Sequence, residues 1–282
     1  MNPKIYDCFC YFNEDMLLEL RLETLWNHVD YFVIVESTKT ISGNEKPINF
    51  DLEKFKKFKQ KIRYLLIQEH PFDTTDAWRN ERYQRDYIEN GLFDAEDHDW
   101  IMISDLDEIP RPEAIKQFNP EKYLRGDFEQ YAYSYYLNNI CVNNGTPIIW
   151  HGSRIVTFKN FKQFFRGAER VRNYKSSGML RGLKRYWLKK FKTQYIANGG
   201  WHFTWIADIS QMIKKLESFA HQEYNTPEYK DPEKIKEKIN NGLDILNPTA
   251  RFKCQPINDD LPAYLIQNQD KYARWLRPVN TE

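Results

Sequence analysis

Short apolar runs alternate with amphipathic stretches through the first hundred residues. Four of the runs are too short for buried helices and predict strands, over residues 4–11, 31–35, 62–67 and 100–103. Between them, the spacing of the apolar residues predicts helices over 14–28, 52–61 and 77–90. Strands that alternate with helices form parallel sheets with right-handed crossovers. The pattern therefore predicts an α/β fold in which a mostly parallel sheet is flanked by helices.

The pattern changes in the second half of the chain. Residues 129–137 alternate in polarity and are rich in tyrosine, and further short strands are predicted near residue 150. We therefore expect the complete sheet to be mixed. Because no repeat or low-complexity linker separates these segments, we predict one main domain over 1–250, with a helical extension over 251–282 packed on it.

The most informative stretch is the end of the fourth predicted strand. Asp105, Asp107 and Glu108 follow its apolar run, and Pro110 stops the strand from continuing. In open α/β sheets, ligands bind at the carboxyl ends of the strands. Carboxylates at this place suit Mg²⁺ or Mn²⁺, and such an ion can hold a diphosphate. The alternative is an acidic turn whose aspartate caps the next helix.

Two other segments offer polar groups for the same chemistry. His202 follows a pair of glycines in an aromatic, strand-like run, and it is either a ligand for an Mn²⁺-type ion or a hydrogen-bonded core histidine. Arg79, Arg82 and Arg85 lie along one side of a predicted helix, which either faces a diphosphate or is solvated. Because the chain has neither a dinucleotide glycine fingerprint nor a Walker A loop, we expect a metal, not backbone amides, to bind phosphate.

Composition narrows the choice of partners and compartment. The formal net charge is +1, which gives no electrostatic case for nucleic acid, and no apolar run approaches the length needed to cross a bilayer. The four cysteines are scattered, as in proteins of a reducing compartment, and residues 2–4 lead directly into the first predicted strand without a signal peptide. We therefore expect a cytoplasmic protein.

A basic amphipathic segment covers residues 175–195. It contains many Lys and Arg residues and no acid. Three interpretations stay open: peripheral contact with an anionic membrane or a lipid-linked acceptor, a loop that orders over a diphosphate, or a solvated surface helix. Farther along, Glu217 and His221 are four residues apart and share a face of a predicted helix.

Five motifs occur in an order that resembles a known family. They are Cys10-Tyr-Phe-Asn-Glu14, Val35-Glu-Ser37, Ile103-Ser-Asp-Leu-Asp-Glu-Ile-Pro110, Gly199-Gly-Trp-His-Phe203 and Lys215-Leu-Glu-Ser-Phe-Ala-His-Gln-Glu223. Together they resemble glycosyltransferase family 17, whose animal members add bisecting GlcNAc to glycoproteins. The resemblance runs from about Tyr6 to Leu276, and without a membrane anchor the chain is more similar to a soluble bacterial or viral member.

The resemblance implies a GT-A fold, which is a Rossmann-like fold of nucleotide-diphospho-sugar transferases. It also implies metal-dependent, inverting transfer of a sugar from a UDP-sugar to a hydroxyl of a glycan or glycolipid. The donor implied by the family is UDP-GlcNAc. Asp105 and Asp107 would bind Mn²⁺ or Mg²⁺ and the donor, and His202 would complete the metal shell. Glu36 would contact uridine or ribose, and Arg85 the diphosphate or the sugar.

The sequence alone does not identify the general base of such a transfer. It must be a carboxylate or imidazole within hydrogen-bond reach of the acceptor hydroxyl, and Glu108, Glu169, Glu217 and His221 are candidates. For a cytoplasmic enzyme, peripheral at the inner membrane surface, we expect the acceptor to belong to a surface polysaccharide, a lipooligosaccharide or another glycan. Two other functions remain: a non-catalytic module that binds glycans or nucleotides, and a metal-dependent phosphoryl transferase.

Overall fold

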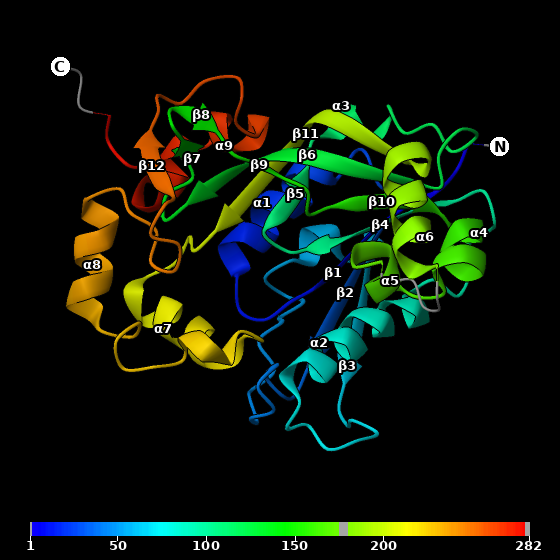
Figure 1. Cartoon of the computed structure of the whole chain (residues 1–282), viewed down its shortest axis with the longest axis horizontal. Helices are drawn as coiled ribbons and strands as arrows, with labels where there is room; N and C mark the ends of the chain where they lie inside the picture. Colours follow the sequence, from blue (N-terminus) through cyan, green and yellow to red (C-terminus); the bar gives the residue numbers. More distant parts are fainter. Residues whose placement is uncertain (1, 175–179, 280–282) are drawn as a thin grey trace.

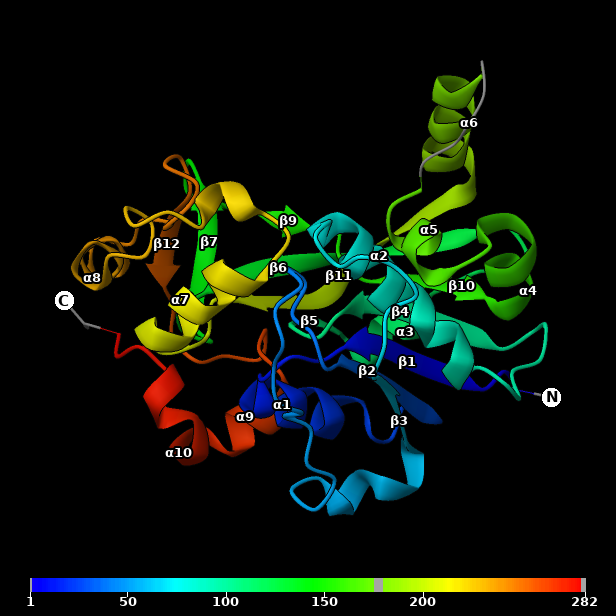
Figure 2. The ribbon, with the colours of Figure 1, turned by 90° about the horizontal axis from the view of Figure 1, so that it is seen from below.

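A computed structural model describes residues 2–174 and 180–279, which form a twelve-stranded sheet with helices on both faces (Figure 1, Figure 2). The main path of the sheet runs β12-β7-β6-β10-β4-β1-β2-β3.

The strands are β1 Ile5–Cys10, β2 Tyr31–Ser37, β3 Ile62–Ile67, β4 Trp100–Asp105, β5 Glu108–Pro110, β6 Arg125–Ser134, β7 Asn139–Asn143, β8 Thr146–Pro147, β9 Ile149–Trp150, β10 Arg154–Thr157, β11 Thr193–Thr204 and β12 Arg251–Cys254. The α-helices are α1 Asp15–Leu25, α2 Ala77–Asp86, α3 Pro112–Ile115, α4 Phe158–Asn160, α5 Ala168–Arg172, α6 Arg181–Trp187, α7 Ile209–Ser218, α8 Pro232–Asn240, α9 Ala263–Gln267 and α10 Gln269–Tyr272. Short 3-10 or π turns are η1 Lys56–Lys61, η2 Tyr87–Gly91, η3 Phe161–Phe165, η4 Leu188–Lys192, η5 Gln222–Tyr224 and η6 Ala273–Trp275.

The four strands predicted in the first half are confirmed, and they pair in parallel. β1 lies between β2 and β4, and β3 lies beyond β2. Successive side chains of a strand point to opposite faces. Phe9 and Met102 therefore join the core cluster that holds α1 and α9, whereas Cys8 and Ile103 join the cluster that holds η2, η3 and α5. Burial on both faces explains why these strands are continuous apolar runs.

The second half adds antiparallel strands, as predicted. β6 is antiparallel to β7, β9 and β10 and parallel to β11. The short strand β5 comes directly after the Asp105–Asp107 turn and pairs with β11, which sets His202 opposite Glu108. This pairing fixes the acidic turn between β4 and β5 and brings a segment almost a hundred residues away next to it.

Two predictions about the helices need correction. In residues 52–61 only Lys56–Lys61 are helical, as the 3-10 turn η1. The extension over 251–282 is not purely helical, because β12 first joins the edge of the sheet beside β7. The following helix is then broken at Asn268, whose φ of −126° and ψ of 38° separate α9 from α10. No helix within residues 2–174 and 180–279 has both the length and the apolar character to cross a membrane.

Candidate functional site

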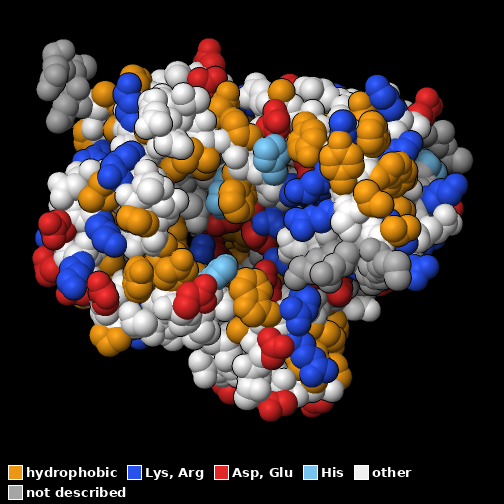
Figure 3. Space-filling view, viewed as in Figure 1, with side chains coloured by type: hydrophobic (Ala, Val, Ile, Leu, Met, Phe, Trp, Pro, Cys, Tyr) orange, Lys and Arg blue, Asp and Glu red, His pale blue; other side chains and the backbone are white. Residues whose placement is uncertain are grey.

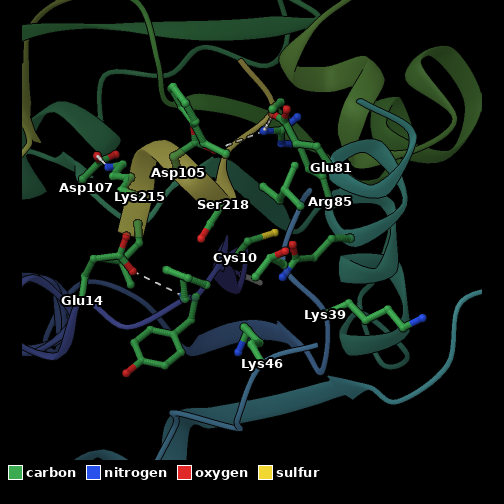
Figure 4. Close-up of a pocket in the computed structure, with 18 of the residues that line it drawn as sticks. Cys10, Glu14, Lys39, Lys46, Glu81, Arg85, Asp105, Asp107, Lys215 and Ser218 are labelled. Carbon is green, nitrogen blue, oxygen red and sulfur yellow. Dashed lines mark hydrogen bonds and ion pairs between the residues drawn. The ribbon is translucent and has the colours of Figure 1, made fainter. Parts of the chain in front are cut away.

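A cleft of about 320 Å³ opens at the carboxyl ends of β1 and β4. It is the hollow near the centre of the face in Figure 3, and Figure 4 shows its charged side chains from close by. One wall is the loop after β2, and the opposite wall is the end of α7. Charged side chains that line it are Glu14, Lys39, Lys46, Glu81, Arg85, Asp105, Asp107 and Lys215. Tyr11, Phe12, Trp78, Phe219 and His221 add aromatic surface.

The acidic turn is held from below by Arg21, which is fully buried on α1. Its Nη1 donates to the backbone carbonyls of Asp105, Leu106 and Glu108, at 2.9 to 3.0 Å. Its charge is balanced by Asp7 on β1, with Nη2 2.6 Å from Oδ1. A guanidinium can donate up to five hydrogen bonds in fixed directions, so a single residue determines the course of the turn.

Asp105 lies between two arginines. Its Oδ2 is 2.7 Å from Arg172 Nη2. Its Oδ1 is 3.2 Å from Nη2 of Arg85, and Figure 4 shows both Asp105 and Arg85. Partial desolvation in the cleft raises the pKa of the Asp105 carboxyl, but Arg172 and Arg85 outweigh this effect and hold the pKa well below its usual range. Both oxygens are thus engaged by guanidinium groups, and Asp105 is ionised at neutral pH.

Glu108 does not line the cleft but lies behind Asp105, with its side chain 1% exposed. It accepts hydrogen bonds from Arg172, from the Asp105 amide at 2.9 Å and from Trp150 Nε1 at 2.6 Å. The backbone at Gly152 passes so near that a Cβ atom would lie 2.1 Å from Glu108 Oε1. Burial raises the pKa of Glu108, but Arg172 outweighs it and lowers the pKa. The prediction of Glu108 as a base that meets an acceptor is therefore corrected: its oxygens bind Arg172 instead.

Asp107 projects into the cleft beside one imidazole and one ammonium group. Its Oδ1 is 3.8 Å from His202 Nε2, and its Oδ2 is 3.4 Å from Lys215 Nζ. Burial lowers the pKa of Lys215, but Asp107 and Glu14 outweigh this effect and raise it, so the ammonium stays charged. The structure thus brings together the predicted pair Asp107 and His202 and adds Lys215 from α7.

The donor set at Asp107 fits a divalent ion with two protein ligands. His202 stacks on Trp150 with ring centroids 4.9 Å apart, and its buried Nδ1 has no hydrogen-bond partner among the described residues. Asp105 faces arginines instead, and within residues 2–174 and 180–279 no three His, Cys, Asp or Glu side chains converge on one point. Mg²⁺-type ions are often held by one or two protein ligands together with substrate phosphates, and imidazole is a known transition-metal ligand. Asp107 and His202 are thus the residues that would hold an ion, whereas both oxygens of Asp105 face guanidinium groups and its role as a direct ligand stays a prediction.

Glu36, predicted to contact the donor, is fully buried beneath the loop after β2. It accepts hydrogen bonds from Lys46 Nζ, from the amides of Asn49 and Phe50 and from Tyr64 Oη, at 2.5 to 3.1 Å. With four donors on two oxygens, little acceptor capacity is left for a ligand. The structure places Glu36 as an anchor of the wall of the cleft, not on its surface.

The remaining predicted residues fall into different places. Arg85 lies in the cleft, where it binds Glu81 at 2.6 Å and Glu169 as well as Asp105. His221 lines the cleft but is half exposed, and its Nδ1 is 2.8 Å from Glu223 Oε1. Glu217 lies outside the lining, exposed and paired with Lys230 at 3.0 Å. The shared helix face predicted for Glu217 and His221 is wrong, because α7 ends at Ser218 and the chain turns before His221.

The second half of the predicted basic segment projects from the body as α6 and η4 (Figure 2). Residues 175–179 of that prediction lie outside the described residues. Near its base, a second cavity of about 950 Å³ adjoins the cleft, and Trp78 and Glu81 line both. The cleft therefore continues past Arg85 into a larger polar space.

Comparisons with solved structures find remote similarity. Glucosyl-3-phosphoglycerate synthase from Mycobacterium tuberculosis, in complex with Mn²⁺, UDP and phosphoglyceric acid, is 10% identical over 70% of this chain and 69% of that chain, with a TM-score of 0.36. An active-site mutant of LgtC is 12% identical over 99% and 98% of the two chains, with a TM-score of 0.35. The bifunctional glycosyltransferase WbbM is 9% identical over 57% and 33%, with a TM-score of 0.30. Similarity at this level carries no inference about substrates, and no curated protein matches the chain.

A family model gives the decisive match. The model described as glycosyltransferase family 17 matches residues 1–143, which is half of the chain and includes β1, β2 and the whole acidic turn. The predicted α/β class is confirmed by the mixed sheet, and the GT-A fold agrees with this family assignment. The resemblance to this family is thereby confirmed over the half of the chain that holds the first three motifs, and the chain belongs to glycosyltransferase family 17.

Proposed function

We propose that this glycosyltransferase moves a sugar, GlcNAc by family habit, from a UDP-sugar to a hydroxyl of a glycan acceptor with inversion at the anomeric carbon. The observation that carries the proposal is the position of Asp107, which projects into a cleft at the carboxyl ends of parallel strands with Lys215 and His202 beside it. A carboxylate that can hold a metal ion, with an ammonium group beside it, suits a ligand that bears a diphosphate.

The nucleotide would lie against the wall formed by Tyr11, Phe12 and the loop after β2. The partly exposed ring of Phe12 there offers stacking for a base, and Lys39 and Lys46 lie on the same side (Figure 4). The buried carboxylate of Glu36 fixes this loop and thereby preserves the shape of the wall. Such preorganisation lowers the entropy cost of binding.

Asp107 and His202 are the residues that would hold Mn²⁺ or Mg²⁺. When bound, such an ion supplies Lewis-acid stabilisation of the negative charge that develops on the leaving diphosphate. Lys215 contributes a second, permanent positive charge on the same side of the cleft. Asp105 keeps Arg85 and Arg172 in fixed positions, so that their guanidinium groups need little reorganisation during the reaction.

The general base is best sought where the two cavities meet. Glu81 lines both of them, and Glu169 lines the larger one. Both carboxylates bind Arg85, which orients them toward the junction. One carboxylate of this pair would take the proton of the acceptor hydroxyl while that oxygen bonds to the anomeric carbon and the diphosphate leaves with the bonding electrons.

The test is a UDP-release assay with UDP-GlcNAc, UDP-Gal and UDP-Glc, run with Mn²⁺ and an acceptor mixture. We expect turnover of a UDP-sugar, and a loss of about 10²–10⁴-fold in kcat in whichever of Glu81→Gln and Glu169→Gln removes the base. UDP binding, followed separately by calorimetry, should persist in both variants. Phosphate release from UDP without a sugar would favour a phosphoryl transferase. Binding of UDP-sugars with no turnover for any acceptor would favour the non-catalytic module.

A further inference from the structure

The larger cavity beside the cleft is lined by an unusual number of cationic side chains. It lies between β6, β10, β11, α5 and the base of the projecting helix, and Lys and Arg side chains gather beside the central hollow in Figure 3. The cations that line it are Arg82, Arg125, Arg154, Arg172, Arg185 and Lys189. Its acidic side chains are Asp76, Glu81, Asp127 and Glu169.

At the floor of this cavity two arginines share one carboxylate. Asp127 Oδ1 lies 2.7 Å from Arg125 Nε and 3.2 Å from Arg154 Nε. All three side chains are at least 88% buried, since the most exposed of them, Arg154, is 12% exposed. Nε of Arg154 faces this carboxylate without the geometry of a hydrogen bond, and its Nη1 donates to the carbonyls of Gly152 and Ser153 at 3.2 Å. The group therefore carries one positive charge in excess in a place poorly reached by water.

None of the other acids that line the cavity lies within ion-pair distance of Arg125 or Arg154. Glu81 and Glu169 are bound to Arg85. Asp76 caps α2 through the Arg79 amide at 3.0 Å, at the far end of that helix. Burial, together with the nearby Arg125 and Arg172, lowers the pKa of Arg154 to about 10, against the opposite effects of Asp127 and Glu108. A buried guanidinium without a full counter-charge is costly, and an anion is the ligand that removes this cost.

We propose that this cavity binds an anionic group of the acceptor, a phosphate or a carboxylate, through Arg154 and Arg125. Guanidinium groups suit both because their parallel N–H groups match two oxygens of either anion. The cavity meets the cleft at Glu81, so an anion held at Arg154 leaves the neighbouring part of the acceptor facing the donor sugar. The assignment of the anion to the acceptor rests on the proposed function, whereas the anion site itself does not.

Calorimetry on the full chain, saturated with UDP and Mn²⁺, tests the site with three probes: galactose, galactose 6-phosphate and galacturonate. We expect each charged sugar to bind at least about tenfold more tightly than galactose, which corresponds to about 1.4 kcal/mol. Comparison of the two charged sugars distinguishes phosphate from carboxylate. Arg154→Gln should abolish the preference, and Arg154→Lys should keep part of it. The matched control is Arg251→Gln, an exposed arginine on the edge strand β12 that does not line the cavity.

Equal binding of charged and neutral sugars would overturn the proposal, and so would a preference that survives in Arg154→Gln. A separate titration with UDP distinguishes an error in the anion site from an error in the proposed function. If UDP binds and no charged sugar does, the anion site is wrong and the transferase assignment stands. If a charged sugar binds through Arg154 and UDP does not bind, the anion site stands and the donor assignment is wrong.

A separate observation concerns the projecting segment of α6 and η4. Four large side chains on it, Leu183, Tyr186, Trp187 and Phe191, are exposed by 41 to 65%, and Leu180 directly before α6 is exposed by 57%. Interspersed with them are Lys184, Arg185, Lys189, Lys190 and Lys192, and no acid occurs between Glu169 and Asp208. In Figure 2 the helix stands clear of the body, so these side chains can meet a flat surface. Apolar residues interleaved with cations are complementary to the interface of an anionic bilayer.

We infer that this segment docks on anionic membranes. The test is flotation of the full chain with vesicles of phosphatidylcholine alone or with about 30% phosphatidylglycerol. Binding should require the anionic lipid and weaken in 0.5 M salt, because exposed charges are then screened. Leu183→Ser with Phe191→Ser should lose binding, whereas Phe93→Ser, which removes an exposed phenylalanine elsewhere, should not. Failure to float with anionic vesicles overturns the inference. A concentration-dependent dimer that the same double substitution abolishes would assign the surface to a second copy instead.

Discussion

The strongest quantitative prediction concerns Arg172→Gln. Arg172 is 9% exposed and binds two carboxylates, Asp105 and Glu108, of which Glu108 is 1% exposed. Removing the guanidinium leaves Glu108 buried with only Trp150 and one backbone amide as donors. Breaking a buried ion pair from one side costs about 3–5 kcal/mol. For 282 residues the entropy of unfolding near 60 °C is about 0.6 kcal/mol/K, so the expected fall in Tm is about 5–8 °C.

The sign of the pH dependence follows from the direction of the pKa shifts. In the folded wild type, the pKa values of Asp105 and Glu108 are lowered, so these groups stabilise the fold above their unfolded values of about 4. This stabilisation is lost as the pH falls through the folded values. Without Arg172, burial instead raises the pKa of Glu108, and the variant regains stability as that carboxyl takes up a proton. The loss caused by the substitution is therefore larger at pH 7.5 than at pH 5.

Urea unfolding at pH 7.5 and pH 5 measures both quantities. We expect the difference in free energy of unfolding between the wild type and Arg172→Gln to be at least about 1 kcal/mol smaller at pH 5 than at pH 7.5. A rise of less than one unit in the pKa of Glu108 is enough for this change. The matched control is Arg82→Gln, whose exposed partner Asp76 is 3.9 Å away and whose loss should cost about 0–1 kcal/mol. A destabilisation of Arg172→Gln below about 1 kcal/mol, or one that is independent of pH, would refute the reasoning about the buried network.

Three further predictions test other parts of the cleft. Gly200→Ala should lower the free energy of unfolding by more than about 2 kcal/mol, because Gly200 has a φ of +134° and a Cβ would lie 2.2 Å from Ile109 O; unchanged urea unfolding would contradict this. Glu36→Gln should lower the free energy of unfolding by roughly 1.5–3 kcal/mol, because Lys46 loses a buried partner. It should also speed proteolysis within residues 38–50, and cleavage at the wild-type rate would count against this prediction. Lys215→Met should tighten Mn²⁺ binding by at least about fivefold in calorimetry, because a cation 3.4 Å from Asp107 costs an incoming ion on the order of 1 kcal/mol even in water.

The pattern of apolar residues was sufficient to predict the strands in the first half of the fold. Buried parallel strands need apolar side chains on both faces, and this requirement made the strands visible as continuous runs. The prediction that Asp105 and Asp107 leave the sheet at a ligand-binding edge agrees with the cleft for the same reason. One further signal was available and overlooked. Arg21 lies four residues from Leu17 and from Leu25 in the apolar stripe of α1, and a cation in such a stripe indicates a buried ion pair.

The rest of the site depends on contacts that no local pattern encodes. Arg172 reaches Asp105 across 67 residues, and Lys215 reaches Asp107 across 108. A single sequence gives both cations the appearance of ordinary surface residues. The same limit explains Glu36 and Glu108: their positions at strand ends were visible, but the donors that occupy them come from a loop, from Trp150 and from Arg172.

The measurement that tests the central claim most directly is thermal unfolding with UDP-GlcNAc, with and without Mn²⁺, in the wild type, Asp107→Ala and His202→Ala. Donor at 100 times its Kd should stabilise the wild type by about 2.7 kcal/mol, a rise in Tm of about 4–5 °C, and the rise should require Mn²⁺. Both variants should fold but lose the Mn²⁺-dependent rise, and Asp107→Ala should also lose transfer. A Mn²⁺-dependent rise of the same size in Asp107→Ala would contradict the account.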